Sequence, residues 1–218
     1  NESAFISKLL EIVKSVPTET MGFEKEILVV DDGSKDGTGD LARAVSGVKV
    51  FTQVPNQGKG RAVQRGIAES TGELILIQDA DLEYDPNDYL TLLKALGPGV
   101  DSVYGSRTLG QLKVNGWSLF PGRHAEQSFG PWLAGVLLTL WTAIWYGVWI
   151  TDTLTAYKLY PAKAVRSMAL RTSGFETDHE ITARLVREGY RIAEVPIAYL
   201  PRSVKKNKKI KPSDGFIA

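Results

Sequence analysis

The chain of 218 residues contains no cysteine and only two histidines. The absence of cysteine excludes a disulfide framework, a cysteine-ligated zinc site and a thiol nucleophile. His124 and His179 do not stand at a metal-ligand spacing and have no identifiable serine partner, which argues against catalysis by histidine. The first residues also lack the basic and then apolar pattern of a secretion signal. The candidate functional groups are therefore carboxylates, lysines and arginines.

An excess of one charge sign is missing as well. Lysine and arginine total 26 against 25 aspartates and glutamates, which gives a formal net charge of +1. This balance provides no electrostatic case for nucleic-acid binding by the whole molecule, so any function based on charge must be local. Gly58-Lys59-Gly60 lacks the full P-loop spacing, and no G-x-G-x-x-G follows the first expected strand. These absences argue against an ATPase and a dinucleotide-dependent dehydrogenase.

The first half of the chain alternates between helix and strand patterns. An amphipathic helix is expected at 5–16, closed by Pro17. Strands are expected at 26–30, 48–52, 74–78 and 101–104, and helices at 36–45, 58–70 and 86–96. This alternation predicts an open, mostly parallel α/β sheet with flanking helices, whose ligands bind beyond the carboxyl ends of the strands.

The chain divides into four segments by pattern and composition. Residues 1–127 are expected to form an α/β core, and 128–150 an apolar helix. Residues 151–201 read as strand, helix, helix and strand, with the second helix at 180–188. Residues 202–218 form a basic tail. The sequence carries no signal for an oligomeric state.

Two carboxylate clusters follow expected strands, Asp31-Asp32 and Asp79-Ala80-Asp81, with Glu83 two residues further on. Strand carboxyl ends share one edge of a parallel sheet, so both clusters are expected to face one crevice. In extended backbone alternate side chains point to the same side, so Asp79, Asp81 and Glu83 can converge on a metal. Such oxygen ligands suit Mg²⁺ or Mn²⁺ carrying substrate phosphates. A solvated acidic turn is the alternative, as is an ordinary turn with a helix cap for the first cluster.

The segment Val30-Asp31-Asp32-Gly33-Ser34-Lys35-Asp36-Gly37-Thr38 resembles the VDDGSxDGT motif of family-2 glycosyltransferases. Further segments follow in the order of the dolichyl- and polyprenyl-phosphate mannose or glucose synthase branch, at 56–62, 78–86, 105–107, 151–158, 174–181, 194–197 and the basic tail. The resemblance covers nearly the whole chain. It implies that 1–127 is the nucleotide-sugar-binding core, 151–201 the remainder of the catalytic domain and 202–218 a phosphate-contacting tail. It implies a GT-A-like, Rossmann-related fold and a metal-dependent, inverting transfer of a hexose from a GDP- or UDP-sugar to a polyprenyl or dolichyl phosphate.

The same resemblance implies roles for individual residues. The nucleotide-sugar-binding residues would be Glu2, Asp31, Asp32, Gly33, Lys59 and Asp79, and the metal ligands Asp79, Asp81 and Glu83. The acceptor phosphate and the leaving diphosphate would contact Arg107, Arg202, Lys208 and Lys209. The catalytic set would be Asp79, Asp81, Arg107, Asp152, Glu176 and Asp178. Family members begin with an additional strand, of which only Asn1-Glu2 would remain here.

The acceptor decides what the late carboxylates must do. A lipid phosphate is already ionised near neutral pH, so it needs alignment and leaving-group stabilisation rather than a general base. A saccharide or protein acceptor would require a carboxylate base near Asp152 or Asp178. The alternative functions are a family-2 transferase with a saccharide or protein acceptor and a noncatalytic nucleotide-sugar-binding module. Structural alternatives are a loop cap for Asp152, surface carboxylates for Glu176 and Asp178, and a solvated face for the tail.

Residues 131–150 contain no aspartate, glutamate, lysine, arginine or histidine, and their length reaches that of a membrane-spanning helix. Trp141, Trp145 and Trp149 recur at every fourth position, which favours a helix over 129–149 that lies in the membrane interface with its indoles in one stripe. A membrane span and a buried core helix are the alternatives. We therefore expect a peripheral or monotopic protein on the cytoplasmic side of a membrane.

Overall fold

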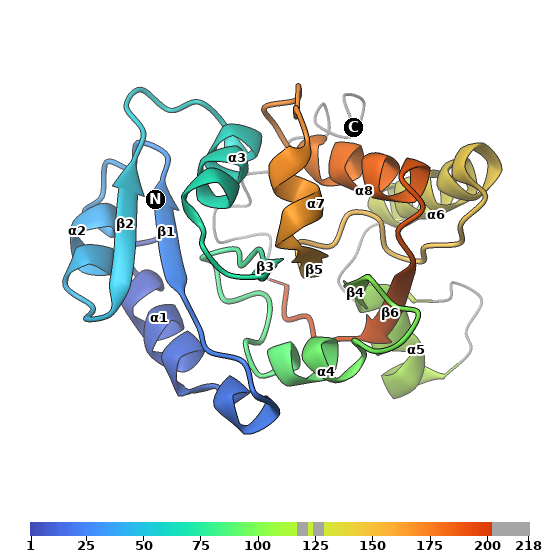
Figure 1. Ribbon diagram of the computed structural model, residues 1–218, viewed down its shortest axis with the longest axis horizontal. Coiled ribbons are helices and arrows are strands. Elements are labelled where there is room, and N and C mark those ends of the chain that lie inside the picture. The colour runs from blue at the N-terminus through green and yellow to red at the C-terminus, as the bar shows by residue number, and fades with distance from the viewer. Residues whose placement is uncertain (117–121, 124–128, 202–218) are drawn as a thin grey trace.

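The computed structural model describes residues 1–116, 122–123 and 129–201, and its strands form two sheets (Figure 1). β1 (Ile27–Asp31) and β2 (Val48–Thr52) pair in parallel, with Val29 opposite Val50. The second sheet has the order β3-β5-β4-β6, formed by β3 (Leu74–Leu76), β4 (Ser102–Ser106), β5 (Lys158–Pro161) and β6 (Ile192–Pro196). β5 is antiparallel to both neighbours, whereas β3, β4 and β6 share one direction. The predicted α/β fold with a mostly parallel sheet is confirmed.

Helices pack on both faces of the second sheet. Successive residues of a strand point to opposite faces, and the neighbours Val103 and Tyr104 of β4 follow this rule. Val103 lies in a core with α1 (Ile6–Ser15) and α4 (Asp88–Lys94). Tyr104 lies in a second core, formed with α3 (Lys59–Glu69), α7 (Ala162–Ser167) and α8 (Thr177–Arg187). The sheet thus packs against an apolar core on each face, and most of the candidate site residues lie in the loops at its edge.

Most expected helices are present, with shorter bounds. α2 (Thr38–Arg43) lies within the expected 36–45, and the carboxylate of Asp36 accepts a hydrogen bond from the Thr38 N–H at 3.1 Å. Two elements were not predicted, the 3-10 helix η1 (Thr18–Met21) and α5 (Arg107–Asn115). α5 begins at a serine cap, because Ser106 Oγ accepts the N–H of Leu109. This cap places Arg107 at the first position of a helix.

The late half follows the predicted order of strand, helix, helix and strand, as β5, α7, α8 and β6. α8 begins at Thr177, three residues before the expected start at 180. The carboxylate of Glu176 accepts hydrogen bonds from the N–H groups of Ser173 and Gly174 and so fixes the turn that leads into the helix. Asp178 therefore stands in the first turn of α8 rather than ahead of it.

The apolar helix is shorter than predicted. α6 spans Phe129–Tyr146, and Gly147 follows in the left-handed conformation, with φ 69°, which commonly ends helices. Trp149 consequently does not continue the helical stripe of Trp141 and Trp145, so the prediction of one helix to residue 149 is wrong. Among the described residues, no helix combines the length and the apolar character that crossing a membrane requires.

Candidate active site

The first motif loop is held by its own carboxylates. Asp31 ends β1, and its buried carboxylate accepts the N–H of Ser34 at 3.0 Å. The two carboxylate oxygens of Asp32 accept the N–H groups of Gln57 and Gly58, each at 2.8 Å. Asp32 thereby anchors the loop before α3 to the end of β1.

The N-terminal residues lie against the same loop. The N–H of Glu2 donates to Thr38 Oγ1 at 2.8 Å, and Asn1 Oδ1 accepts the N–H of Lys35 at 2.7 Å. Gly33 has a φ of 74°, a conformation that favours glycine and lets the loop turn back. Glu2 and Gly33 thus lie at the motif, and their contact with a nucleotide sugar stays a prediction.

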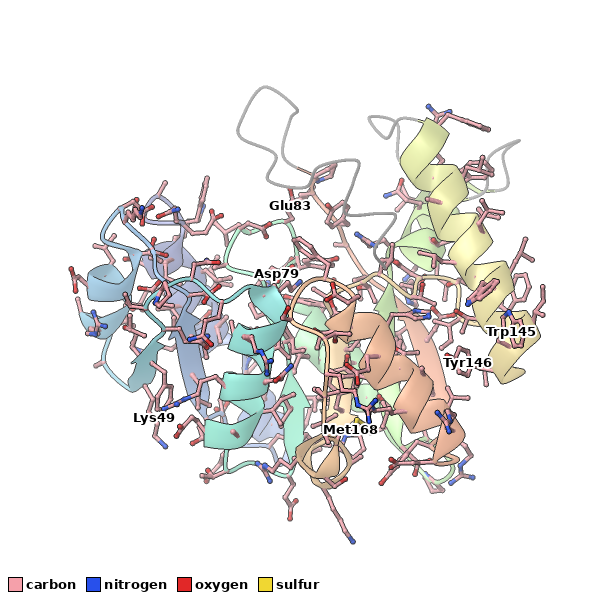
Figure 2. The ribbon with its side chains drawn as sticks, turned by 90° about the horizontal axis from the view of Figure 1, so that it is seen from above. Lys49, Asp79, Glu83, Trp145, Tyr146 and Met168 are labelled. Carbon is pink, nitrogen blue, oxygen red and sulfur yellow. The ribbon has the colours of Figure 1, made fainter. Side chains whose placement is uncertain are left out.

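Lys59, the first residue of α3, joins three elements. Its ammonium lies 3.0 Å from Asp79 Oδ1, which follows β3, and 3.7 Å from Asp178 Oδ2 in α8. Burial disfavours the charged amine, but the two carboxylates outweigh it and raise the pKa of Lys59 above its usual value. Figure 2 shows Asp79 close to the start of α3, with Glu83 beyond it. Because Asp32 binds Gly58 and Asp79 binds Lys59, the start of α3 connects the two carboxylate clusters.

Gly60 allows the starts of α3 and α8 to approach each other closely. A Cβ atom on Gly60 would lie 2.0 Å from Thr177 Oγ1, so only glycine fits between the starts of α3 and α8. The N–H of Gly60 also donates to Ser173 O at 2.8 Å. This close approach brings Lys59 within reach of Asp178.

Arg107 and Asp152 form a bidentate ion pair across from this cluster. Arg107 Nε and Nη2 lie 2.7 Å and 2.8 Å from the two carboxylate oxygens of Asp152, and the Arg107 N–H donates to the same carboxylate at 2.9 Å. The carboxylate of Glu194 in β6 accepts hydrogen bonds from the N–H groups of Thr151 and Asp152, which fixes the loop that carries Asp152. Charge-assisted bidentate pairs of this kind hold their geometry strongly. Asp152 is therefore mainly an ion-pair partner, and the contact of Arg107 with a phosphate stays a prediction.

The turn after β3 departs from the predicted metal geometry. β3 ends at Leu76 and Leu82 has a φ of 59°, so residues 79–83 are not extended. Asp81 Oδ1 accepts the N–H of Glu83 at 3.2 Å, and Glu83 Oε2 accepts the hydroxyl of Tyr199 at 2.6 Å. In the part of the chain that the structure describes, no three acidic or histidine side chains group closely enough to hold an ion. The extended backbone expected at 79–83 is thus absent, and the joint binding of a metal by Asp79, Asp81 and Glu83 stays a prediction.

The late carboxylates differ in their surroundings. Burial opposes ionisation of Glu176, but nearby backbone N–H groups prevail and lower its pKa. Glu176 therefore shapes the loop before α8. Asp178 is buried beside Lys59, and its Oδ1 has no hydrogen-bond partner among the described residues. The alternative of a surface carboxylate is thus wrong for Asp178.

A tyrosine cluster, which sequence patterns did not indicate, lies between the acidic turn and Arg107. Tyr84 stacks on Tyr157 with ring centroids 4.7 Å apart and contacts Tyr199 at 5.2 Å. The Arg107 guanidinium lies 5.2 Å from the centroid of the Tyr199 ring. Tyr84 and Tyr199 also form a β-bridge. The segment around Tyr199 therefore lies between Glu83 and Arg107.

The predicted phosphate ligands Arg202, Lys208 and Lys209 lie outside the described residues.

Lys158, like the tyrosine cluster, had no role predicted from the sequence. It begins β5 and is fully buried, and its ammonium donates to Thr153 O at 2.8 Å and Asp178 O at 3.3 Å. Burial lowers its pKa to about 8, because the interior disfavours the charged form. A signal was present in the sequence, since this lysine interrupts the apolar run Ala156-Tyr157-Lys158-Leu159-Tyr160.

Comparison with known proteins identifies the class. Residues 1–142 match the model of the glycosyl transferase family 2. The chain belongs to this family. The resemblance drawn from the motifs is thereby confirmed.

Individual relatives narrow the comparison. An undecaprenyl-phosphate mannosyltransferase from Micrococcus luteus is 32% identical over 195 residues, which cover 85% of this chain and 76% of the relative. A polyprenol monophosphomannose synthase from Mycolicibacterium smegmatis is 29% identical over 196 residues, with 84% and 69% covered. A dolichol-phosphate mannosyltransferase from Pyrococcus furiosus is 34% identical over 115 residues, with 51% and 33% covered.

Solved structures agree on the fold. A glucosyl-3-phosphoglycerate synthase from Mycobacterium tuberculosis, in complex with Mn²⁺, uridine diphosphate and phosphoglyceric acid, has a TM-score of 0.68 at 20% identity. The match covers 94% of this chain and 69% of that one. A mannosyl-3-phosphoglycerate synthase from Rubrobacter xylanophilus has a TM-score of 0.66 at 19% identity, with 94% and 65% covered. At these identities the likeness shows the fold alone, and it confirms the GT-A-like prediction.

Proposed function

We propose that the protein transfers a hexose, with inversion, from a GDP- or UDP-sugar to a polyprenyl or dolichyl phosphate at a membrane surface. The observation that carries this proposal is a hydrogen bond from Thr139 of α6 to the carbonyl of Thr151, at 3.4 Å. Thr151 precedes Asp152, the partner of Arg107. An apolar helix and a charged site are thus joined directly, as an acceptor with a phosphate head and a hydrocarbon tail requires.

The surface of α6 supports a lipid partner. Its exposed large apolar side chains are Phe129, Leu133, Val136, Leu137, Leu140, Trp141, Ile144 and Trp145. Trp145 keeps 66% of its surface exposed and lies at the outer edge of the molecule in Figure 2. The side chains of Thr139 and Thr142 are buried on the inner side, and α6 lies beside α8 (Figure 1). A large exposed apolar patch with tryptophans suits the membrane interface.

On the donor side, a divalent metal would neutralise the diphosphate. An ion of this kind needs only one or two protein carboxylates, because substrate phosphates and water complete its shell. Asp81 and Glu83 fit that requirement, whereas Asp79 is engaged with Lys59. When bound, Mg²⁺ or Mn²⁺ would stabilise the charge of the departing nucleoside diphosphate. Asp79 and Lys59 would orient the ribose or the sugar beside it.

On the acceptor side, the arrangement favours positioning over proton abstraction. Both carboxylate oxygens of Asp152 are occupied by Arg107, which makes Asp152 unsuited to act as a base. An acceptor phosphate oxygen is already anionic, so it forms the bond to the anomeric carbon as the bond to the nucleoside diphosphate breaks. Arg107 and the basic residues Arg202, Lys208 and Lys209 would hold the acceptor phosphate and the leaving diphosphate.

One observation favours a second candidate, a transferase with a hydroxyl acceptor. Asp178 Oδ1 is buried and has no hydrogen-bond partner among the described residues, and such a carboxylate could accept a proton from a sugar hydroxyl. Acceptor chemistry therefore separates the two candidates.

The test is a donor panel of GDP-mannose, UDP-glucose and related sugars, each with a polyprenyl phosphate and Mn²⁺ or Mg²⁺. One donor is expected to give a lipid-linked sugar, and a chelator should abolish the product. Turnover with saccharide acceptors and none with any polyprenyl phosphate would overturn the proposal.

The same proposal places the protein on the cytoplasmic face of a membrane, with α6 in the interface plane. The chain has no cysteine, so Gly130→Cys and Trp149→Cys provide single labelling sites near the two ends of α6. In sealed vesicles both cysteines should react from the same side. Reaction from opposite sides would contradict the interfacial orientation.

A further inference from the structure

Lys158 is a buried cation that the proposed reaction does not use. Its side chain has no exposed surface, and its ammonium donates hydrogen bonds to the main-chain oxygens of Thr153 and Asp178. The ring of Tyr104 lies 5.1 Å from the ammonium. Burying a charge without a carboxylate in direct contact is unfavourable, so its position calls for an explanation.

The two carbonyl groups belong to the two segments that carry buried site carboxylates. Thr153 directly follows Asp152, and Asp178 stands in the first turn of α8. The ammonium therefore bridges the loop beneath Arg107 and the helix that meets Lys59. A shift of either segment would move one of these carboxylates relative to the other.

We infer that Lys158 is a positioning residue for sugar transfer, because its ammonium fixes the Asp152 loop against the start of α8 and places positive charge behind both carboxylates. This inference rests on the proposed function. Lys158 itself touches no substrate in this account. It sets the separation between the donor-side carboxylate and the acceptor-side ion pair, and transfer depends steeply on that separation.

Charged and titratable groups from several elements act on Lys158. These groups are Asp152 and Asp178, which favour the ammonium, and Lys59 and Arg107, which oppose it, together with His179 and Tyr104 nearby. Burial lowers its pKa to about 8, so the amine loses its proton just above neutral pH. Turnover of the native protein should therefore decline as the pH rises through this range.

The test compares Lys158→Met, Lys158→Gln and the surface control Lys163→Met on α7. Lys158→Met keeps the bulk but removes the donors, and kcat is expected to fall about 100-fold, since a small misplacement near the reacting groups has that effect. The dissociation constant for the nucleotide sugar should change less than about threefold. Lys158→Gln can donate to both carbonyls, so its kcat should be about tenfold higher than that of Lys158→Met. Because the amide does not titrate, its turnover should show no decline at alkaline pH.

A second measurement does not depend on the acceptor. In Lys158→Met, amide hydrogen exchange should accelerate in both 151–156 and 177–182, and Lys163→Met should exchange like the native protein. Unchanged exchange in those segments, or a kcat equal to that of Lys163→Met, would overturn the inference. If the native protein transfers no sugar to a polyprenyl phosphate, the proposed function fails, and the exchange result still decides whether Lys158 holds the two segments.

Discussion

The donor side and the acceptor side of the site are held by charges in different settings. Lys59 and Asp79 pair with 24% and 31% of their side chains exposed. Arg107 and Asp152 have 27% and 6% of their side chains exposed, and Asp152 accepts three hydrogen bonds from Arg107. A single lysine–carboxylate contact can exchange partners when a diphosphate arrives, whereas a bidentate pair with a buried carboxylate holds one geometry. The comparison suggests an adaptable donor side facing a fixed acceptor side.

The largest expected effect comes from breaking the fixed side. Asp152→Asn leaves the Arg107 guanidinium without its anionic partner, and the free energy of unfolding should fall by about 4 kcal/mol. The matched control is Asp101→Asn, because Asp101 pairs with Arg191 on the surface, where solvent screens the pair and its loss should change stability far less. Urea denaturation measures both. Equal losses in the two variants would remove the contrast between the sides.

A pH series tests the buried cation behind both sides. The pKa of Lys158 is lowered from 10.5 to about 8 in the folded protein, so the unfolded chain binds more protons between these pH values. The free energy of unfolding should therefore rise with pH across that window, by at most about 3 kcal/mol. Subtracting the same series for Lys158→Met isolates this contribution. A difference that stays flat or falls with pH would contradict the assigned burial.

On the donor side, Asp81→Asn should lower transfer about 100-fold, because one anionic contact to the diphosphate-bound metal is lost. The exposed Asp40→Asn on α2 serves as the control. A readout without turnover is the rise in melting temperature on adding the nucleotide diphosphate with Mn²⁺, which should disappear in Asp81→Asn. Near-native turnover at limiting Mn²⁺ would remove Asp81 from the metal site.

Replacing Trp141 and Trp145 by serine tests whether α6 serves the acceptor alone. Each indole withdrawn from the lipid interface should weaken vesicle binding about tenfold, and the pair about 100-fold. Nucleotide-sugar binding should stay at the native level, since the donor side is built from other segments. A loss of thermal stability together with donor binding would indicate a core role for α6.

The smallest effect is expected where the two sides touch. Tyr199→Phe removes the hydroxyl that donates to Glu83 but keeps the ring against Arg107. The Mn²⁺ concentration for half-maximal turnover should rise about tenfold, because a group that orients a metal ligand is lost. Tyr84→Phe loses a hydroxyl that accepts the N–H of Ala156 instead, and its metal requirement should be native.

Local patterns predicted most of the fold. Apolar periodicity located the helices that became α1 to α4, and the strand runs located β1 to β4. The carboxylates at 31–32 and 79 were placed correctly at strand ends, because that position depends only on local sequence and sheet topology. The antiparallel insertion of β5 between β3 and β4 was beyond such patterns, since it depends on pairing between segments far apart in the chain.

Partners within the site were harder to predict than positions. Nothing local indicates that Asp152 pairs with Arg107 or that Tyr199 reaches Glu83. The extended backbone that was expected to align Asp79, Asp81 and Glu83 is absent, because Leu82 adopts a φ of 59°. Each of these features is set by tertiary contacts that sequence spacing does not encode.

The most direct test of the central claim compares two acceptors of equal chain length, a polyprenyl phosphate and the corresponding polyprenol, with one sugar donor. A site that aligns an ionised phosphate without a general base should transfer sugar to the phosphate and none to the alcohol. Equal transfer to the alcohol, lost in Asp178→Asn, would show base catalysis on a hydroxyl acceptor and contradict the account.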